Sequence, residues 1–408
     1  MQIAPNRHLT YCTNIHPANG WIAVQDSLAR YAPSLKAALS PDAPFGIGLR
    51  LSGQESRELL DGEALPRFKT FLDDAGLTVF TMNGFPYGPF HKQPVKDRVH
   101  APDWRDPERV AYTLRLIESL AYLLPEGMQG SISTSPLSYK PWFGDGVDSP
   151  IWTLMTRHVT DVAEALVRVR RERGQHISLA LEPEPDGLLE TSEELVRFFQ
   201  DWLLPVGGPL LAQRLGTTDD EAGRHLLDHI QVCWDTCHVA VAFEAPDEVL
   251  ARYRAAGIQV GKVQLSAALR VLLPDDRAVR AQRAASLQPF VESTYLHQVV
   301  QRDKDGRLRP YRDLDVALPA IQDPRATEWR IHFHVPLFLD RYGDFETTQQ
   351  GIVDTAALLA QDAFTRHLEI ETYTWDVLPE DLKQPLGASI RREFEWVLGV
   401  LQPDGRHA

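Results

Sequence analysis

Cysteine is scarce in this chain of 408 residues, which has only Cys12, Cys233 and Cys237. An odd number of thiols at these spacings fits neither a disulfide framework nor a zinc knuckle, so we expect three buried thiols. Long apolar runs are also missing, since no stretch approaches the roughly 20 residues that cross a bilayer. Residues 1–8 lack the basic and apolar regions of a secretory signal. The sequence therefore predicts a cytoplasmic protein without a membrane span.

Positive charge is in deficit as well, with 42 Lys and Arg against 56 Asp and Glu, a formal net charge of −14. This balance opposes binding to a phosphate backbone, so nucleic acid is excluded as an expected partner and a small molecule is favoured. The one basic run, Arg168 to Arg173, falls at the end of a predicted helix, where cations suit the helix dipole.

Short apolar runs alternate with longer amphipathic stretches, a pattern typical of βα units around a parallel sheet. Eight runs can be counted, and eight strands close a (β/α)₈ barrel. We therefore predict an α/β chain folded as one TIM-barrel domain over residues 1–408. The expected strands are residues 9–15, 46–51, 78–83, 130–134, 177–182, 231–235, 260–266 and 367–372.

Two helices between these runs are clearly indicated. Residues 152–171 place apolar side chains at helical spacing, and residues 192–204 follow the start signal Thr191-Ser192-Glu193-Glu194. A hydroxyl cap with acids in the first turn is typical of a helix N-terminus.

Two segments are too long to be simple connections, and we expect them to decorate the barrel rim after strands five and seven. They cover about residues 205–229 and 269–328. The run 329–337 resembles a ninth strand, but we place it outside the barrel because Pro336 limits strand pairing. Alternation points His332 and His334 to the same side.

Polar residues gather at the carboxyl ends of the predicted strands, where TIM barrels carry their sites. They are Glu182 after strand five, Asp235 and His238 after strand six, Gln264 on strand seven, and Glu369 and Glu371 on strand eight.

Three carboxylates at one barrel mouth would repel one another unless a cation lay between them. We therefore predict a divalent metal site formed by Glu182, Asp235, Gln264 and Glu371. Oxygen ligands favour Mn²⁺, Mg²⁺ or Co²⁺, with Zn²⁺ or Fe²⁺ as alternatives if His238 or His334 joins.

Each of these residues also has a structural interpretation. Glu182 could be an acid in a salt bridge, Asp235 a helix N-cap beside a surface His238, and Gln264 a structural amide. Glu371 is preferred to Glu369 because it is nearer the strand end.

Further polar side chains lie in loops that follow the first and third predicted strands. Lys96 and Arg98, beyond the second of these loops, could meet an anionic substrate group. Asn14 and His16 come from residues 11–17, and Asn83 and His91 come from residues 83–91, which combine glycine turns with aromatic side chains.

The order of site residues resembles the xylose isomerase-like superfamily of sugar isomerases and epimerases: Glu after strand five, Asp-x-x-His after strand six, Glu after strand eight. Gln264 is similar to the glutamine ligand of hydroxypyruvate-isomerase-like members, whereas many sugar epimerases have His there. The resemblance implies that a histidine after strand seven binds substrate or metal, with His334 the first candidate and His332 the second.

Over nearly the whole chain, the sequence resembles EboE-type metabolite traffic proteins. The similarity rests on residues 10–17, 83–91, 95–96, 102–104 and 294–298, the last of which includes His297. It implies a small-molecule pathway involving polyols or cyclitols. The candidate substrate-binding residues are Asn14, His16, Asn83, His91, His297 and His334.

The favoured hypothesis is a metal-dependent isomerase or epimerase of a sugar, hydroxy-ketone or cyclitol-like substrate that passes through an enediolate. Glu182 and Glu371 would be general base and acid, and His238 would orient a substrate hydroxyl. One alternative is a metal-dependent hydrolase or phosphodiesterase of the endonuclease type, using histidines 16, 91, 238, 297 and 334. The other is a non-catalytic metabolite-binding protein.

Overall fold

The computed structural model describes residues 1–89, 95–144, 146–373 and 385–402. Its main sheet contains eight parallel strands, and each of the eight predicted strands is present with ends shifted by a few residues. They are β2 (Arg7–Tyr11), β3 (Phe45–Arg50), β4 (Leu77–Asn83), β5 (Gly130–Thr134), β6 (Ile177–Leu181), β7 (Ile230–Asp235), β8 (Val260–Leu265) and β15 (His367–Ile370).

These strands form a nearly closed barrel. A ninth, short strand, β1 (Gln2–Ala4), pairs antiparallel with β2 at one end of the order β1-β2-β15-β8-β7-β6-β5-β4-β3. The two ends approach each other through a parallel bridge between Cys12, just beyond β2, and Gly48 of β3. All three cysteines are buried free thiols, as predicted.

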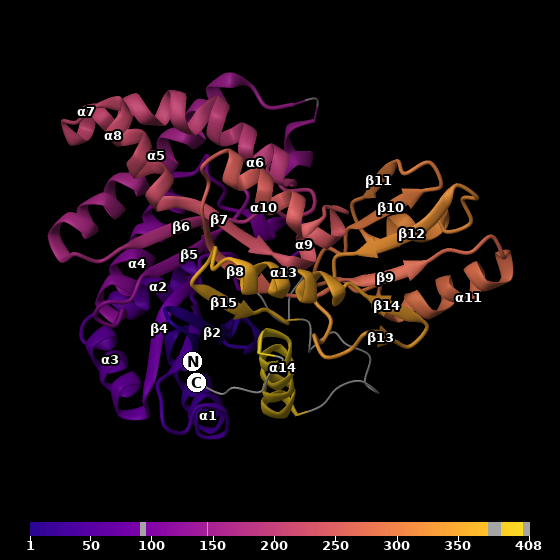
Figure 1. The fold of residues 1–408 in the computed structure, drawn as a ribbon, viewed down its shortest axis with the longest axis horizontal. Helices are drawn as coiled ribbons and strands as arrows, with labels where there is room; N and C mark the ends of the chain where they lie inside the picture. The colour runs from indigo at the N-terminus through magenta and orange to yellow at the C-terminus, as the bar shows by residue number, and fades with distance from the viewer. Residues whose placement is uncertain (90–94, 145, 374–384, 403–408) are drawn as a thin grey trace.

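Helices cover the outside of the barrel (Figure 1). The predicted 152–171 helix is the central part of α5, and the helix expected at Ser192 begins there with a capping box between Thr191 and Glu194. Around the barrel are α1 (Trp21–Leu39), α2 (Gly53–Leu60), α3 (Ala64–Ala75), α4 (Pro107–Leu123), α5 (Ser149–Arg173), α6 (Ser192–Phe198), α9 (Thr236–Val241), α10 (Pro246–Ala255), α13 (Gln350–Gln361) and α14 (Leu386–Leu401).

The segment predicted as the first insertion is helical. A π-helix, Phe199–Gly207, continues α6 and leads into α7 (Gly208–Leu215) and α8 (Asp219–His229). Both α7 and α8 pack on α5.

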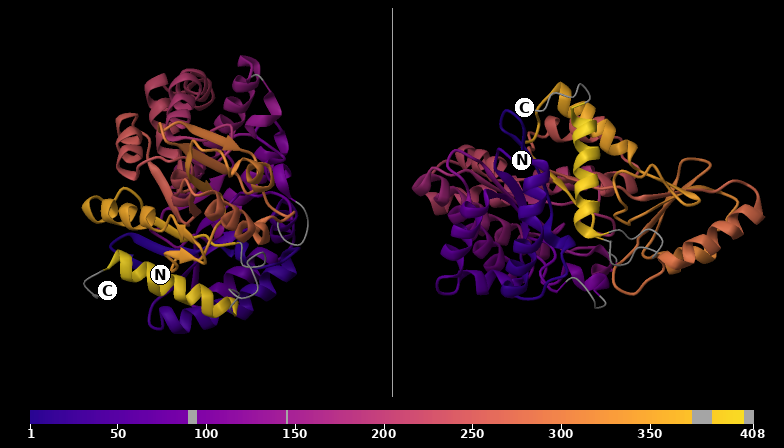
Figure 2. Two further views of the ribbon diagram at one scale, coloured as in Figure 1. Left: turned by 90° about the vertical axis from the view of Figure 1, so that its right-hand side faces the viewer. Right: turned by 90° about the horizontal axis from the view of Figure 1, so that it is seen from below.

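A second sheet is inserted in the chain between β8 and α13. It is antiparallel, with the order β11-β10-β12-β9-β14-β13, and lies to one side of the barrel with α11 (Figures 1 and 2). The run 329–337 is outside the barrel, as predicted, although only its first part belongs to a strand. The elements are β9 (Leu269–Leu272), α11 (Arg277–Leu287), β10 (Val299–Asp303), β11 (Leu308–Tyr311), α12 (Leu314–Ala317), β12 (Ala326–Ile331), β13 (Arg341–Tyr342) and β14 (Phe345–Thr347). A single domain with two rim insertions stays a prediction.

The barrel interior holds a buried ion pair between Lys262 of β8 and Glu369 of β15. Both side chains are fully buried, and Gly48 of β3 faces them. A Cβ atom at Gly48 would overlap the Glu369 carboxylate, so only glycine leaves room for the pair. The pairing with Lys262 therefore holds the Glu369 side chain inside the barrel.

His367, at the start of β15, should make the stability of the protein depend on pH. Burial lowers its pKa from 6.5 to about 3, so the native state keeps the ring neutral while the unfolded chain binds a proton. Stability should fall as the pH drops from 6.5 towards 3, by up to about 4–5 kcal/mol from this residue, at roughly 1.4 kcal/mol per pKa unit. Urea denaturation of His367→Gln at pH 7, 6, 5 and 4 should give a flatter profile than the wild type. An unchanged slope would contradict the prediction.

Candidate functional site

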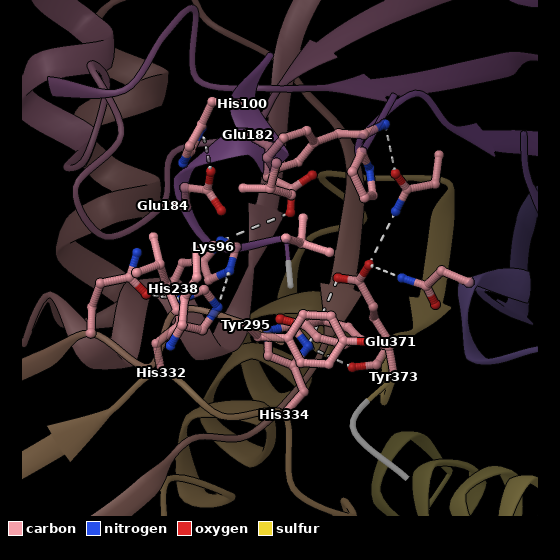
Figure 3. Close-up of a pocket in the computed structure, with 18 residues that line it drawn as sticks. Lys96, His100, Glu182, Glu184, His238, Tyr295, His332, His334, Glu371 and Tyr373 are labelled. Carbon is pink, nitrogen blue, oxygen red and sulfur yellow. Dashed lines mark hydrogen bonds and ion pairs between the residues drawn. The ribbon is translucent and has the colours of Figure 1, made fainter. Parts of the chain in front are cut away.

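The predicted metal ligands meet at the carboxyl end of the barrel. Figure 3 shows two of them, Glu182 and Glu371, in the cavity there. Glu182 follows β6, Asp235 ends β7, Gln264 lies on β8 and Glu371 follows β15. All four are buried, with at most 5% of each residue exposed. The parallel strands bring them together because their carboxyl ends meet at one end of the barrel.

Three carboxylates form the centre of this group. One oxygen each from Glu182, Asp235 and Glu371 lies within 4.8 Å of the others. The Gln264 Nε2 donates hydrogen bonds to all three, at 2.9 Å to Glu182 Oε1, at 3.4 Å to Asp235 Oδ2, and to Glu371 Oε2. The amide therefore turns its nitrogen towards the carboxylates, and its oxygen accepts from Cys233 Sγ at 3.0 Å. A half-turn of the amide would present the oxygen that the sequence predicted as a ligand.

Asp235 has both of the roles considered from the sequence. It is the N-cap of α9, where its Oδ1 accepts from the His238 backbone N–H at 3.0 Å. The same oxygen accepts from Ser266 Oγ at 2.6 Å, and the other faces Gln264. The cap orients the carboxylate without removing it from the site.

Glu371 is held by two amides from loops that the sequence assigned to substrate binding. Its Oε1 accepts from Asn14 Nδ2 at 2.8 Å and from Asn83 Nδ2 at 3.0 Å. Asn14 follows β2 in a short 3₁₀ turn, and Asn83 ends β4. Both line the same cavity as Glu371.

Burial and mutual repulsion control the charge of the carboxylates. Burial, followed by the charge of Asp235, raises the pKa of Glu182 well above its usual value, and burial with the charges of Glu182 and Asp235 does the same for the pKa of Glu371. Burial also opposes ionisation of Asp235, but neighbouring imidazoles and hydrogen bonds outweigh it and lower the pKa. Of the three carboxyls, Asp235 therefore ionises most readily and the two glutamates less readily.

The arrangement fits a divalent cation. Among the described residues, Glu182 Oε2 is buried without a hydrogen-bond partner, although the carboxylate is beside two others. Clustered carboxylate oxygens that lack donors are typical ligands of hard cations. Glu182, Asp235 and Glu371 would hold such an ion, and Gln264 would join them after the amide turn.

Three histidines lie beside the carboxylates. His238 on α9 has its Nε2 at 3.2 Å from His332 Nε2, and its ring centroid is 5.7 Å from that of His334. Burial lowers the pKa of all three, that of His334 to about 4. His332 and His334, which the sequence placed on one side of their segment, both line the cavity.

Other cavity residues were not proposed from the sequence. Glu184, two residues beyond Glu182, faces His100 with Oε1 3.3 Å from His100 Nδ1, and burial raises the pKa of Glu184 well above its usual value. The Glu-Pro-Glu-Pro motif carried a signal for Glu184, because side chains two apart in extended backbone share a side. His100 had none, since a short 3₁₀ helix between β4 and α4, Lys96–His100, brings it in. Tyr295, Gln298 and Tyr373 also line the cavity.

Three residues that the sequence assigned to substrate contacts have other partners in the structure. His16 accepts or donates a hydrogen bond with Tyr11 at 3.0 Å and lines a separate, smaller cavity. His297 uses both ring nitrogens, at 2.9 Å to His332 O and 3.0 Å to Glu292 Oε1. Lys96 lines the main cavity but pairs with Asp313 at 2.6 Å.

Two residues predicted near the substrate remain, Arg98 and His91. Arg98 is exposed and outside the cavity lining. His91 lies outside the described residues.

Comparison with known proteins gives structural neighbours only. No family model and no curated protein matches the chain. A xylose isomerase-like TIM-barrel protein from Mycobacterium smegmatis, in complex with magnesium, is 12% identical, with a TM-score of 0.50 over 97% of this chain and 96% of that one. An L-ribulose 3-epimerase is 13% identical (TM-score 0.49, 98% and 99% covered), and a D-tagatose 3-epimerase-like protein is 11% identical (TM-score 0.47, 98% and 100% covered).

None of the helices in the described parts of the chain combines the length and apolarity needed to cross a membrane. Eight parallel strands, their alternation with helices and the magnesium-bound neighbour agree on one architecture. The chain has the α/β fold of the xylose isomerase-like TIM barrels.

Proposed function

We propose that the protein is a divalent-metal-dependent isomerase or epimerase acting on a sugar, hydroxy-ketone or cyclitol-like metabolite. The observation that carries this proposal is the group of three buried carboxylates within 4.8 Å of one another, in which burial and mutual repulsion raise the pKa of Glu182 and of Glu371 well above the usual value. Two coupled carboxyls with different surroundings are suited to proton transfer in both directions.

The two glutamates differ in their hydrogen bonds. Glu371 accepts from Asn14, Asn83 and Gln264, all of which favour its ionised form, whereas Glu182 has one oxygen without a partner among the described residues. Once the cation has displaced its proton, Glu371 would be the base that takes the proton from the substrate carbon, and Glu182 would be the acid that returns a proton to it. Return to the neighbouring carbon gives isomerisation, and return to the opposite face gives epimerisation.

Polarisation of the substrate would come from the cation. A divalent ion held by Glu182, Asp235 and Glu371 would act as a Lewis acid on adjacent carbonyl and hydroxyl oxygens. His238, which lines the cavity beside Asp235 with its Nε2 3.2 Å from His332 Nε2, would orient a substrate hydroxyl. Asn14 and Asn83 fix the Glu371 carboxylate, which keeps the base in place during proton transfer.

The test is incorporation of solvent deuterium. Protein reconstituted with Mn²⁺ in D₂O should place deuterium on carbon in at least one member of a panel of ketoses and cyclitol ketones, detected by mass spectrometry. Absence of exchange across the panel with each of Mn²⁺, Mg²⁺ and Co²⁺ would reject the isomerase proposal. The resemblance to EboE-type proteins and the cytoplasmic location stay predictions that this test does not address.

Cation binding should stabilise the protein, and more so at higher pH. The raised pKa values of Glu182 and Glu371 mean that metal-free native protein keeps protons that the unfolded chain loses above about pH 4.5, so its stability falls as the pH rises. The cation replaces those protons and contributes about 2.7 kcal/mol at 100 times its dissociation constant. Thermal unfolding with and without Mn²⁺ should show a larger gain at pH 8 than at pH 5. An equal gain in stability at pH 8 and at pH 5 would contradict the assignment of the cation to these carboxylates.

A hydrolase or phosphodiesterase is the second candidate, favoured by the neighbouring rings of His238, His332 and His334. Hydrolytic sites with several metals need imidazole ligands in addition to carboxylates. Metal counting by mass spectrometry separates the two candidates, because three zinc ions per chain would exclude the isomerase. A metabolite-binding protein without catalysis would bind its ligand after Glu371→Gln and show no turnover in either form.

A further inference from the structure

A further cavity, here called the interface cavity, lies between the barrel and the inserted sheet. Helix α9 contacts both α13 of the barrel and β12 of the inserted sheet at this place (Figure 1). The interface cavity has a volume of about 380 Å³, against about 60 Å³ for the cavity of the candidate site, and the two share no lining residue. Its volume is within the range of about 300–1,000 Å³ that is usual for small-molecule sites. The interface cavity therefore has room for a ligand of its own.

Three arginines of the inserted sheet line the interface cavity. They are Arg270 of β9, Arg302 of β10 and Arg330 of β12. All three donate to the carboxylate of Glu328, a residue that is only 1% exposed. The Nε atoms of Arg270 and Arg330 are 3.0 and 2.8 Å from Glu328 Oε1, and Arg302 donates to Oε2. One buried carboxylate therefore faces three guanidinium groups.

The charges of this cluster do not cancel. Besides Glu328, only Glu346 pairs with it, at 2.9 Å from Arg270, among the residues that the structure describes. Burial, with the charges of Arg302 and Arg270, lowers the pKa of Arg330, although Glu328 opposes the change. Three guanidinium groups and two carboxylates leave one positive charge in excess.

Two acids on the barrel side of the interface cavity do not remove this excess. Glu244 pairs with Arg252 at 3.0 Å and also accepts from the Ser192 backbone N–H at 3.0 Å. Asp354 of α13 is exposed and accepts from Gln350 Nε2 at 2.9 Å, so solvent screens its charge. The arginine side of the cavity stays positive.

Arg302 and Arg330 keep hydrogen-bond donors for a ligand. Arg302 uses only Nη2, on Glu328, while Arg330 uses Nε on Glu328 and Nη1 on the Ala240 carbonyl oxygen at 2.6 Å. Within the described ranges, Arg302 Nε and Nη1 and Arg330 Nη2 have no protein acceptor, and none of these atoms is buried. Both guanidinium groups lie over the Phe243 ring, with Cζ 4.9 and 4.0 Å from its centroid. This contact limits their movement, which reduces the entropy lost on binding.

We propose that the interface cavity binds a phosphate dianion, either free phosphate or the phosphate group of a metabolite, through Arg302 and Arg330. Guanidinium groups form short, charge-assisted hydrogen bonds with phosphate oxygens, and a phosphate offers several such oxygens to the free donors. The N-terminus of α13, where Gln350 and Gly351 line the same cavity, adds a favourable field for an anion. This site uses none of the residues assigned to isomerase chemistry.

Calorimetric titration of the full chain without metal tests the site. Inorganic phosphate or glucose 6-phosphate at pH 7.5 should bind at one site per chain with a dissociation constant of about 1 mM or lower. Acetate should bind at least about tenfold more weakly than the better of the two. Tighter binding of glucose 6-phosphate identifies a phosphorylated metabolite as the ligand, and equal or weaker binding identifies the free ion. Without metal, phosphate cannot bind through a cation at the carboxylates.

Arg302→Gln should weaken phosphate binding at least about tenfold, because it removes one positive charge and two free donors. Arg309→Gln is the matched control. Arg309 lies on β11 of the same sheet, pairs with Asp303 at 2.7 Å and is outside the lining of the interface cavity, and the two arginine side chains are similarly exposed, at 41% and 31%. The control should bind phosphate like the wild type. Unchanged affinity in Arg302→Gln overturns the proposal, and so does a wild-type chain that binds neither phosphate or binds acetate equally well.

A measurement on the unaltered chain decides the matter if Arg302→Gln fails to fold. Phenylglyoxal modifies accessible guanidinium groups, and mass spectrometry of peptides locates each modified arginine. Phosphate at ten times its dissociation constant should slow the modification of Arg302 about tenfold and leave that of Arg309 unchanged. No protection of Arg302, or equal protection of both arginines, overturns the proposal. Deuterium exchange is measured separately, so failure of this site and failure of the isomerase proposal are distinguishable.

Discussion

Replacing Glu371 by Gln should reduce deuterium exchange into substrate at least about 10³-fold, the middle of the range for loss of a general base. Glutamine keeps the size of the side chain and accepts hydrogen bonds from Asn14 and Asn83, but it cannot take a proton from carbon. The initial rate of exchange at saturating Mn²⁺ measures the effect.

Glu393→Gln is the matched control for this variant. Glu393 on α14 is another buried glutamate, and burial raises its pKa to about 8, but it binds Thr372 and the Leu337 backbone and lies outside the cavity lining. It should exchange deuterium at the wild-type rate. Equal losses in both variants would show that Glu371 acts only through packing.

Glu371→Gln should also make the metal-free protein more stable, by about 1–2 kcal/mol at pH 8. The substitution removes one of three carboxylates that repel one another, and it lets Gln264 turn its oxygen towards residue 371. A gain in stability with a loss of activity is expected of a functional residue and not of a structural one. Urea denaturation without metal provides the measurement, and a loss of stability would contradict the assigned repulsion.

The second large effect is on folding. Lys262→Met should destabilise the protein by about 3–5 kcal/mol, because it leaves the Glu369 carboxylate in the barrel interior without its partner. Neither side chain is exposed, so water cannot replace the missing ammonium group. Chemical denaturation at pH 7.5 measures the loss.

The double variant Lys262→Met/Glu369→Met separates charge from packing. Replacing both partners of a buried pair by apolar residues of similar size is often neutral. The double variant should therefore recover most of the stability lost by Lys262→Met alone. If it is no more stable than the single variant, the pair contributes packing and not charge compensation.

The barrel could be predicted because its signals are local. A buried parallel strand is an apolar run of a few residues, and the helix that follows has its own period and caps, as Thr191 and Glu194 show for α6. The inserted sheet could not be predicted, because its strands pair with partners that are far away in the sequence. Strand β9 pairs with β12 and β14, both more than 50 residues away along the chain. Nothing near Leu269 indicates those partners.

The same distinction applies to the site. Glu182, Asp235, Gln264 and Glu371 could be predicted to meet because the fold itself aligns strand ends. The orientation of the Gln264 amide depends on Cys233, and the place of His100 depends on a short 3₁₀ helix between β4 and α4. His16 and His297 were proposed from their neighbours in sequence, but side-chain contacts turn them to Tyr11 and Glu292.

The inserted sheet has a consequence for how this cavity was assembled. Its strand β12 delivers His332, and His334 follows two residues later, whereas the carboxylates all come from the barrel strands. Residues 269–347 contribute both of these imidazoles and none of the residues Glu182, Asp235, Gln264 and Glu371. The acidic and the imidazole parts of the cavity wall therefore come from separate parts of the chain, and a change in the inserted region would alter the imidazoles without moving the carboxylates.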